Sequence, residues 1–257
     1  MDGYTRSSYG DAFADVYDDW YADADDTAAM VELVAGLAAT STGETGVGRV
    51  LELAVGTGRL AVPLADLGLE VVGVDASQAM LDRLTERDRH GRVGRILGDM
   101  VDDQPPGPFD VVLIAYNSLF NLEDADRQRA CFRAVAERLT QRGAFVVEAF
   151  VPDDPPQRGT VVSVRSMTRD EVVLSISEHD PDGQRAHGHL VQLVDGDRLR
   201  LRPWAIRYAS PSELDAMSTS AGLRLQERWQ DATRSTFDAD SARHVSVYGS
   251  MHGNVPQ

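Results

Sequence analysis

Lysine is absent from this chain of 257 residues, because all 25 of its basic side chains are arginine. A Walker P-loop, a pyridoxal enzyme with a Schiff base and a protein kinase each need a lysine amine, so none of these classes fits. Cysteine is nearly absent as well, and Cys131 stands alone. A disulfide framework, a cysteine-rich zinc site and a cysteine-held iron–sulfur cluster are therefore excluded.

Long apolar runs and basic patches are missing too. No apolar stretch approaches the roughly 18 residues of a membrane-spanning helix. The net charge of −16 opposes binding to a nucleic-acid backbone. The first 30 residues carry eight aspartates against one arginine, opposite to the charge of a secretory or mitochondrial leader. These features predict a cytoplasmic protein with neither nucleic-acid nor membrane partners.

Hydrophobic periodicity divides the chain into four regions. Residues 1–45 have apolar side chains at helical spacing, which predicts an N-terminal helical lid in two pieces. Residues 46–150 alternate short β-rich runs with helix-like segments. Residues 151–208 begin with the proline-rich PDDPPQRG and continue as an inserted antiparallel β meander. Residues 209–257 hold one helix, expected to start at Ser210 or Ser212, and two more strands that complete the core.

The second region sets the fold class. Its five apolar runs, at 50–54, 71–75, 93–97, 109–116 and 144–150, are separated by helix-like segments at 60–68, 77–90 and 126–143. Strands that alternate with helices are typical of a parallel sheet covered on both faces. The sequence therefore predicts a doubly wound α/β fold with a mostly parallel seven-stranded sheet.

A glycine-rich turn lies where the first strand leads into a helix. Gly56 and Gly58 let the backbone approach a ligand closely and expose helix N-terminal amides. GTGRLA, residues 56–61, matches the nicotinamide-type pattern, and Asp75 follows at about the spacing of a ribose-binding acid. Glu52 instead favours a ligand with a cationic amine over a pyrophosphate. A tight turn without a ligand is the remaining interpretation.

Residues 50–100 resemble the class I S-adenosylmethionine-dependent methyltransferases. The first motif of that family, acid-x-Gly-x-Gly-x-Gly, stands here as ELAVGTG, residues 52–58, with Ala54 at the first glycine. The resemblance implies S-adenosylmethionine as cofactor, with Asp75 on the ribose hydroxyls and Asp99 on the adenine amine. The full set implied to bind the cofactor is Tyr17, Glu52, Leu53, Ala54, Gly56, Gly58, Asp75, Ala76, Met80, Asp99, Met100 and Ala115.

Other segments resemble actinobacterial natural-product methyltransferases of the amino-sugar and lincosamide N-methyltransferase type. These segments are YGDAFADVYDDWY at 9–21, NSLFNL at 117–122 and VVEAFVPDD at 146–154, together with the inserted meander. The resemblance implies that Tyr9 and Tyr17 close over the sulfonium and the acceptor, whereas core packing alone would also explain their helical stripe. Amino-sugar members of that group have a histidine where this chain has Asn121. The resemblance therefore does not imply a histidine base at this position.

The methyl acceptor determines whether a general base is needed. A base is optional for an amine, since alignment supplies most of the rate, but it is closer to obligatory for a hydroxyl. The predicted catalytic residues are Tyr9, Tyr17 and Glu148, and those expected to face the acceptor are Tyr9, Asn117, Phe120, Asn121 and Glu148. For Glu148 the alternative to contact with the acceptor is a carboxylate that is simply solvated or caps a backbone end. His179, His187, His189 and His244 are further candidate bases, but no metal site is predicted from them.

The sequence thus predicts methyl transfer from S-adenosylmethionine to a small-molecule acceptor. An amine nitrogen in natural-product or antibiotic biosynthesis is the favoured acceptor. Oxygen or carbon methylation by the same fold, a nicotinamide-dependent oxidoreductase and a cofactor-binding protein without catalysis are the alternatives. The strand edges of the meander also indicate a surface for self-association.

Overall fold

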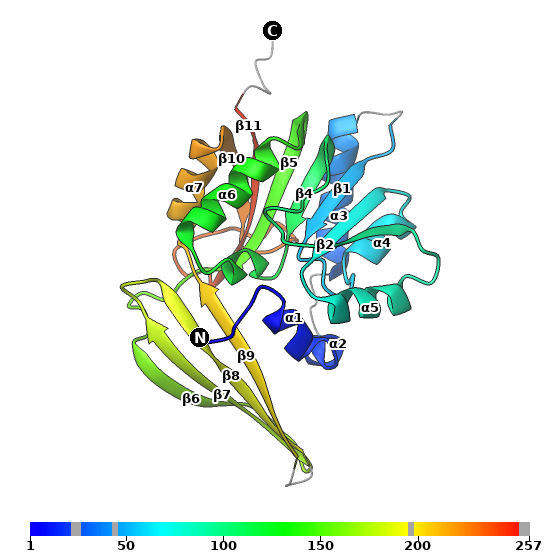
Figure 1. Cartoon of the computed structure of the whole chain (residues 1–257). Coiled ribbons are helices and arrows are strands. Elements are labelled where there is room, and N and C mark those ends of the chain that lie inside the picture. Colours follow the sequence, from blue (N-terminus) through cyan, green and yellow to red (C-terminus); the bar gives the residue numbers. More distant parts are fainter. Residues whose placement is uncertain (22–26, 43–45, 195–197, 252–257) are drawn as a thin grey trace.

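The computed structural model describes residues 1–21, 27–42, 46–194 and 198–251. Within them the main sheet has seven strands in the order β10-β11-β5-β4-β1-β2-β3 (Figure 1). Five strands run parallel, while β11 is antiparallel to β5 and β10 to β11. Their bounds are β1 Arg49–Leu53, β2 Glu70–Asp75, β3 Val93–Leu97, β4 Phe109–Ile114, β5 Leu139–Phe150, β10 Leu223–Trp229 and β11 Arg243–Ser250. The predicted doubly wound α/β fold is confirmed.

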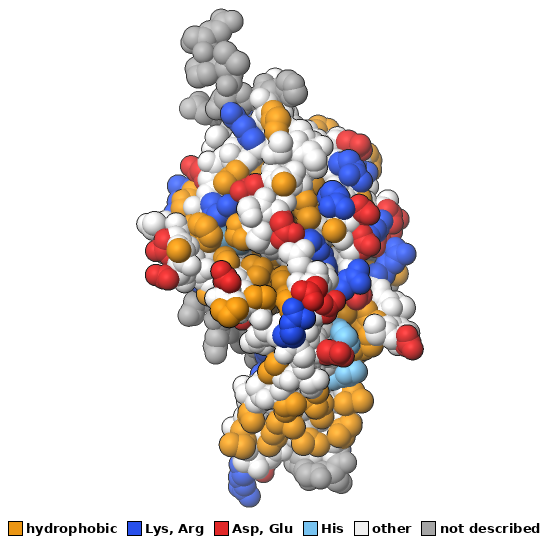
Figure 2. Space-filling view, turned by 90° about the vertical axis from the view of Figure 1, so that its left-hand side faces the viewer, with side chains coloured by type: hydrophobic (Ala, Val, Ile, Leu, Met, Phe, Trp, Pro, Cys, Tyr) orange, Lys and Arg blue, Asp and Glu red, His pale blue; other side chains and the backbone are white. Residues whose placement is uncertain are grey.

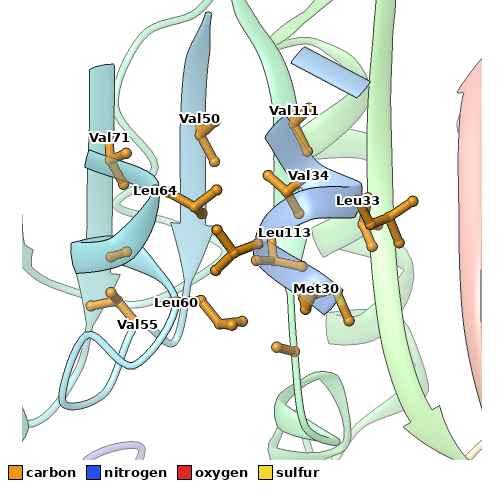
Figure 3. Close-up of a cluster of buried hydrophobic side chains, with 14 of the residues drawn as sticks. Met30, Leu33, Val34, Val50, Val55, Leu60, Leu64, Val71, Val111 and Leu113 are labelled. Atoms are coloured by element: carbon orange, nitrogen blue, oxygen red, sulfur yellow. The ribbon is translucent and has the colours of Figure 1, made fainter. Parts of the chain in front are cut away.

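Helices cover both faces of this sheet because its central strands are apolar on both sides. In β4, Val111 and Leu113 join one buried cluster, whereas Val112 and Ile114 join the other. The first cluster packs under α3 (Thr27–Thr42), α4 (Ala61–Asp66) and α5 (Gln78–Arg87), as Figure 3 shows for part of it. The second packs under α6 (Ala125–Ala136) and α7 (Pro211–Ser220). The central strands are thereby held rigid, with their carboxyl ends at one edge.

A second, four-stranded antiparallel sheet follows β5. Its strands are β6 (Gly159–Met167), β7 (Glu171–Asp180), β8 (Arg185–Val194) and β9 (Arg198–Arg207), paired in chain order. The helices α1 (Ser8–Phe13) and α2 (Tyr17–Trp20) lie at the junction between the two sheets (Figure 1). The N-terminal segment therefore contacts β9 of the second sheet and α5, which covers the main sheet.

The two faces of the second sheet differ. One face packs on α1, where the buried Arg202 donates to the Ala12 carbonyl and, at 2.5 Å, to Asp15 Oδ1. The other face is apolar and exposed (Figure 2). Its outermost side chains are Val162, Val164, Met167, Leu199 and Leu201, each more than half exposed. No helix in the described ranges is long and apolar enough to cross a bilayer.

Two predicted boundaries are wrong. The described part of residues 1–45 forms three helices, α1, α2 and α3, rather than two helical pieces, and residues 22–26 and 43–45 lie outside the described ranges. The helix expected to reach residue 143 ends at Ala136, and β5 already begins at Leu139. Gly143 lies within β5 and is therefore not a helix stop. The close approach of the neighbouring strand explains the glycine, since a Cβ there would lie 2.9 Å from the Phe109 carbonyl oxygen.

The last helix follows its sequence signals. Ser210 and Glu213 form a reciprocal capping box at the start of α7. The predicted start at Ser210, with Pro211 in the first turn, is therefore confirmed.

Candidate active site

The glycine loop after β1 is built from left-handed backbone. Ala54, Gly56 and Gly58 have φ angles of 56°, 56° and 76°. A side chain in this conformation costs about 1 kcal/mol, which gives a physical reason for a glycine at the first position of the motif. Ala54 accepts this strain, and its side chain borders the cavity described below.

Asp75 joins the glycine loop to the start of α5. Its Oδ2 accepts from the Gly56 amide at 2.8 Å, and its Oδ1 accepts from the Ser77 amide at 2.9 Å. Burial raises the pKa of this carboxyl group. Each oxygen can still accept one more hydrogen bond. This geometry suits a pair of adjacent hydroxyl donors, such as those of a ribose.

The first of two neighbouring cavities, called here the cofactor cavity, lies over the ends of β1, β2 and β3. Seven of the twelve residues implied to bind the cofactor line it: Tyr17, Ala54, Asp75, Ala76, Met80, Asp99 and Met100. Arg6, Tyr9, Gly10, Ser118, Asn121 and Leu122 complete the wall. The other five are not among its lining residues: Glu52, Leu53, Gly56, Gly58 and Ala115. The side chain of Leu53 is fully buried in the core.

Asp99 presents one carboxylate oxygen to the cofactor cavity. Its Oδ1 accepts from Arg127 Nη2 at 2.5 Å and from the Val101 amide at 2.8 Å. Its Oδ2 lies 3.4 Å from Nη1 of the largely exposed Arg6. An adenine amine bound to Asp99 would therefore share Oδ2 with Arg6, a residue that sequence reasoning did not select.

Glu52 is buried behind the glycine loop. Its Oε2 has no hydrogen-bond partner within the described residues. Burial raises the pKa of the carboxyl group from 4.5 to about 8, while the positive charge of Arg59 opposes that shift. An unsatisfied buried carboxylate oxygen is stabilised by a nearby cation. The residues here thus fit a cofactor that carries an ammonium group next to a ribose.

The second cavity, called here the acceptor cavity, measures about 280 Å³. Aromatic side chains dominate its wall. The ring centroid of Tyr21 lies 4.8 Å from that of Tyr17 and 5.2 Å from that of Tyr116. It shares Tyr9, Tyr17, Ser118 and Asn121 with the cofactor cavity. The remaining lining residues are Phe13, Tyr21, Tyr116, Asn117, Phe150, Arg165, Ser175, Leu190, Trp204 and Ile206. The two cavities therefore meet at a common wall.

The acceptor cavity holds neutral phenols and one arginine. Burial raises the pKa of Tyr9, Tyr17 and Tyr116, so these hydroxyl groups stay protonated at neutral pH. The Arg165 guanidinium lies 5.4 Å from the ring centroid of Trp20 and 5.1 Å from that of Tyr21. None of the described lining residues is Asp, Glu or His, which places the four histidines considered as bases outside this cavity.

Two residues predicted to face the acceptor are placed elsewhere. Phe120 is fully buried and packs edge-on against Phe150, with 5.0 Å between ring centroids, so the prediction for Phe120 is wrong and Phe150 lines the cavity instead. Glu148 lines neither cavity. Its Oε2 accepts from the Tyr116 amide at 2.9 Å, and its carbonyl oxygen accepts from the Asn117 amide at 3.0 Å. Its predicted catalytic contact stays a prediction that this placement does not support.

Other site residues were missed in the sequence. Tyr21 could have been found, because it follows Tyr17 at i+4 spacing in the same motif. Arg165 and Trp204 could not, since each becomes part of the cavity only through the pairing of the second sheet. Asn117 and Asn121 do line the acceptor cavity, and Asn117 Oδ1 also accepts from the Phe150 amide at 2.6 Å.

Comparison with known proteins identifies the family. A methyltransferase-domain model matches residues 50–143. Cypemycin N-terminal methyltransferase of a Streptomyces species is 31% identical over 181 residues, which are 68% of this chain and 72% of that protein. The CcbJ methyltransferase from Streptomyces caelestis is 41% identical, with a TM-score of 0.88 over 96% of this chain and 99% of its own. DesVI of Streptomyces venezuelae, 24% identical, has a TM-score of 0.67 over 91% of this chain and 97% of its own, and shares the fold.

The chain belongs to the S-adenosylmethionine-dependent methyltransferases. Its methyl donor is S-adenosylmethionine, and the nicotinamide interpretation of GTGRLA is discarded.

Replacement of Asp75 tests the ribose contact. Asp75→Ala should weaken binding of S-adenosylhomocysteine by at least about 1.5 kcal/mol, because two hydrogen bonds to a charged acceptor are lost. Isothermal titration calorimetry measures this change. Asp82→Ala, an exposed carboxylate on α5, is the control and should bind normally. An unchanged affinity in Asp75→Ala would remove Asp75 from the site.

The raised pKa of Glu52 makes stability depend on pH. A buried carboxyl group whose pKa rises on folding stabilises the fold below pH 4.5, and that contribution is lost as the pH rises toward 8. Glu52→Gln cannot ionise, so it does not lose this contribution. The free energy of unfolding of the variant minus that of wild type should therefore rise by up to about 1.4 kcal/mol per pH unit across this window. Urea unfolding at several pH values measures the difference. The exposed Glu137→Gln should show no such trend, and a flat difference for Glu52→Gln would contradict the buried ionisation.

Proposed function

We propose that the chain methylates an amine nitrogen of a small molecule in natural-product biosynthesis. The observation that carries this proposal is the common wall of the two cavities, formed by Tyr9, Tyr17, Ser118 and Asn121. A donor on one side of this wall and an acceptor on the other would meet at it. The relative at 31% identity is named as a methyltransferase of the N-terminus of cypemycin, and a chain terminus of that kind offers an amine, which supports an amine acceptor here.

The chemistry of the acceptor cavity favours nitrogen over oxygen. The bound cofactor supplies an electrophilic methyl group. A hydroxyl acceptor needs a base to remove its proton, whereas an amine with a free lone pair needs only alignment. The described lining holds no carboxylate or imidazole, and burial raises the pKa of Tyr9, Tyr17 and Tyr116. Such a cavity can align a nucleophile but is poorly equipped to deprotonate one.

The same cavity supports an amine in its neutral, reactive form. The positive charge of Arg165 disfavours a protonated amine nearby, and so lowers the pKa of that amine. Once nitrogen has gained the methyl group it carries positive charge, and the faces of Tyr17, Tyr21 and Tyr116 can stabilise that charge. A volume of about 280 Å³ is close to that of a small-molecule site.

A matched substrate panel tests the acceptor element. Amines and the corresponding alcohols of the same carbon skeletons are incubated with methyl-labelled S-adenosylmethionine, and products are located by tandem mass spectrometry. We expect label on nitrogen and none on the matched alcohols. Label confined to oxygen or carbon would replace the proposal, and binding of S-adenosylhomocysteine without any transfer would indicate a protein that only binds the cofactor.

Tyr17 is proposed to orient the acceptor through its hydroxyl group. Tyr17→Phe keeps the ring but removes that hydroxyl, so turnover should fall at least about tenfold, the equivalent of one lost hydrogen bond. The melting temperature should stay the same, and turnover should be compared at saturating S-adenosylmethionine, because Tyr17 also lines the cofactor cavity. Tyr4→Phe, outside both cavities, is the control. A wild-type rate in Tyr17→Phe would return Tyr17 to a packing role.

We also propose that a second copy of the chain covers the exposed apolar face of the second sheet. Two chains of charge −16 repel each other, so contact is least opposed where charged side chains are absent. The face around Val162, Val164, Met167, Leu199 and Leu201 is such a region, and it can pair with itself about a two-fold axis.

The oligomeric state tests this pairing. Wild type should sediment at twice the chain mass, and Val164→Asp should shift the protein to the monomer by placing a charge in the contact. Ser163→Asp, the neighbouring position on the opposite face of β6, should leave the dimer intact. A monomeric wild type, or a dimer that survives Val164→Asp, would contradict it.

A further inference from the structure

A third cavity of about 150 Å³ lies where the proline-rich segment after β5 passes the second sheet. We call it the distal cavity. Apolar and aromatic side chains form most of its wall, and polar ones stand among them. The lining residues are Phe150, Pro152, Asp153, Pro156, Gln157, His179, Ala186, Trp204, Ile206 and Tyr208. The segment PDDPPQRG, which has no other assigned part in the site, supplies one side of this cavity.

The distal cavity adjoins the acceptor cavity. Phe150, Trp204 and Ile206 line both of them. Trp204 and Ile206 stand two apart on β9 and so point to the same side of the second sheet. Phe150 is held from behind, since its amide donates to Asn117 Oδ1 and its ring packs edge-on against Phe120. A molecule in the acceptor cavity therefore faces a fixed aromatic partition, with more apolar space beyond it.

The size and polarity of the distal cavity define what fits. An apolar cavity of about 150 Å³ is large enough to hold a benzene molecule. Its exposed polar residues, Asp153 and Gln157, stand on the proline-rich segment, where they can contact a polar edge of a ligand. An apolar group that enters this hollow removes its own surface and that of Trp204, Ile206 and Phe150 from water, which favours its binding.

We infer that the distal cavity binds an apolar, ring-sized group of the methyl acceptor itself. The acceptor is then an amine with two parts: a nitrogen in the tyrosine-lined cavity and, past Phe150 and Trp204, an aromatic or branched aliphatic group. This inference rests on the proposed function and extends it, because it assigns a substrate class and makes the proline-rich segment a determinant of specificity.

Two amine series probe the distal cavity directly. Linear alkylamines and ω-phenylalkylamines of matched linker length are titrated calorimetrically into protein saturated with S-adenosylhomocysteine. At the linker length that spans the partition, the phenyl compound should bind at least about tenfold more tightly than its alkyl counterpart, from burial of the ring. Shorter linkers should show no such advantage.

Filling the distal cavity should abolish the tighter binding of the phenyl compounds and leave the other affinities unchanged. The side chain of Ala186 lines the distal cavity but not the acceptor cavity, so Ala186→Leu should leave the affinities for S-adenosylhomocysteine and short alkylamines unchanged. Since Ala186 is buried, the exposed Gln157→Phe at the same cavity is a second variant that does not risk the fold. Gln141→Phe, an exposed position at the other end of β5, is the control.

The outcomes separate this inference from the proposed function. If no amine of either series binds wild type saturated with S-adenosylhomocysteine, the proposed function and this inference are overturned together. Binding of the linear alkylamines with no phenyl advantage at any linker length would overturn this inference alone. So would an advantage that persists in both Ala186→Leu and Gln157→Phe.

Discussion

Three aspartates of the N-terminal segment, Asp11 on α1, Asp15 between the helices and Asp18 on α2, join the loops at the end of the main sheet to the second sheet over the site. Together with the apolar packing of Phe13 on Met80, Val173 and Leu190, they place the side of the cavities that carries Tyr9 and Tyr17. The acidic N-terminal segment thus has a specific structural role. Its contacts are Asp11 Oδ1 with the Ser77 hydroxyl at 2.6 Å, Asp18 Oδ1 with the Thr57 hydroxyl at 2.7 Å, and Asp15 Oδ1 with Arg202 at 2.5 Å.

The site combines a charged cofactor side with a largely uncharged acceptor side. Carboxylates gather behind and around the glycine loop, where they suit hydroxyl and ammonium donors. Across the common wall the groups are phenols, amides and aromatic rings, with Arg165 as the cation among the described lining residues. This division matches a reaction in which the electrophile arrives already activated and the protein mainly fixes the direction of approach.

Local motifs made much of this site predictable. Ala54, Asp75, Asp99 and Tyr17 lie within short segments, and the resemblance of those segments to family motifs implied the roles of Asp99 and Tyr17. What depends on tertiary pairing was not accessible in the same way. Phe120 and Phe150 are both aromatic residues beside strand ends, and only the packing of the short helix 118–121 buries the first and exposes the second to the cavity. Likewise the sequence predicts Gly143 as the end of a helix, and only its close approach to β4 explains why a glycine stands there.

The shared wall has a thermodynamic consequence. Because Tyr9, Tyr17, Ser118 and Asn121 border both cavities, a ligand in one of them changes the surface that the other presents. The two binding free energies are then linked, and linkage is reciprocal: whatever factor the cofactor applies to the affinity for the acceptor, the acceptor applies to the affinity for the cofactor. An affinity measured for either ligand alone therefore describes a different surface from the one on which the methyl group moves.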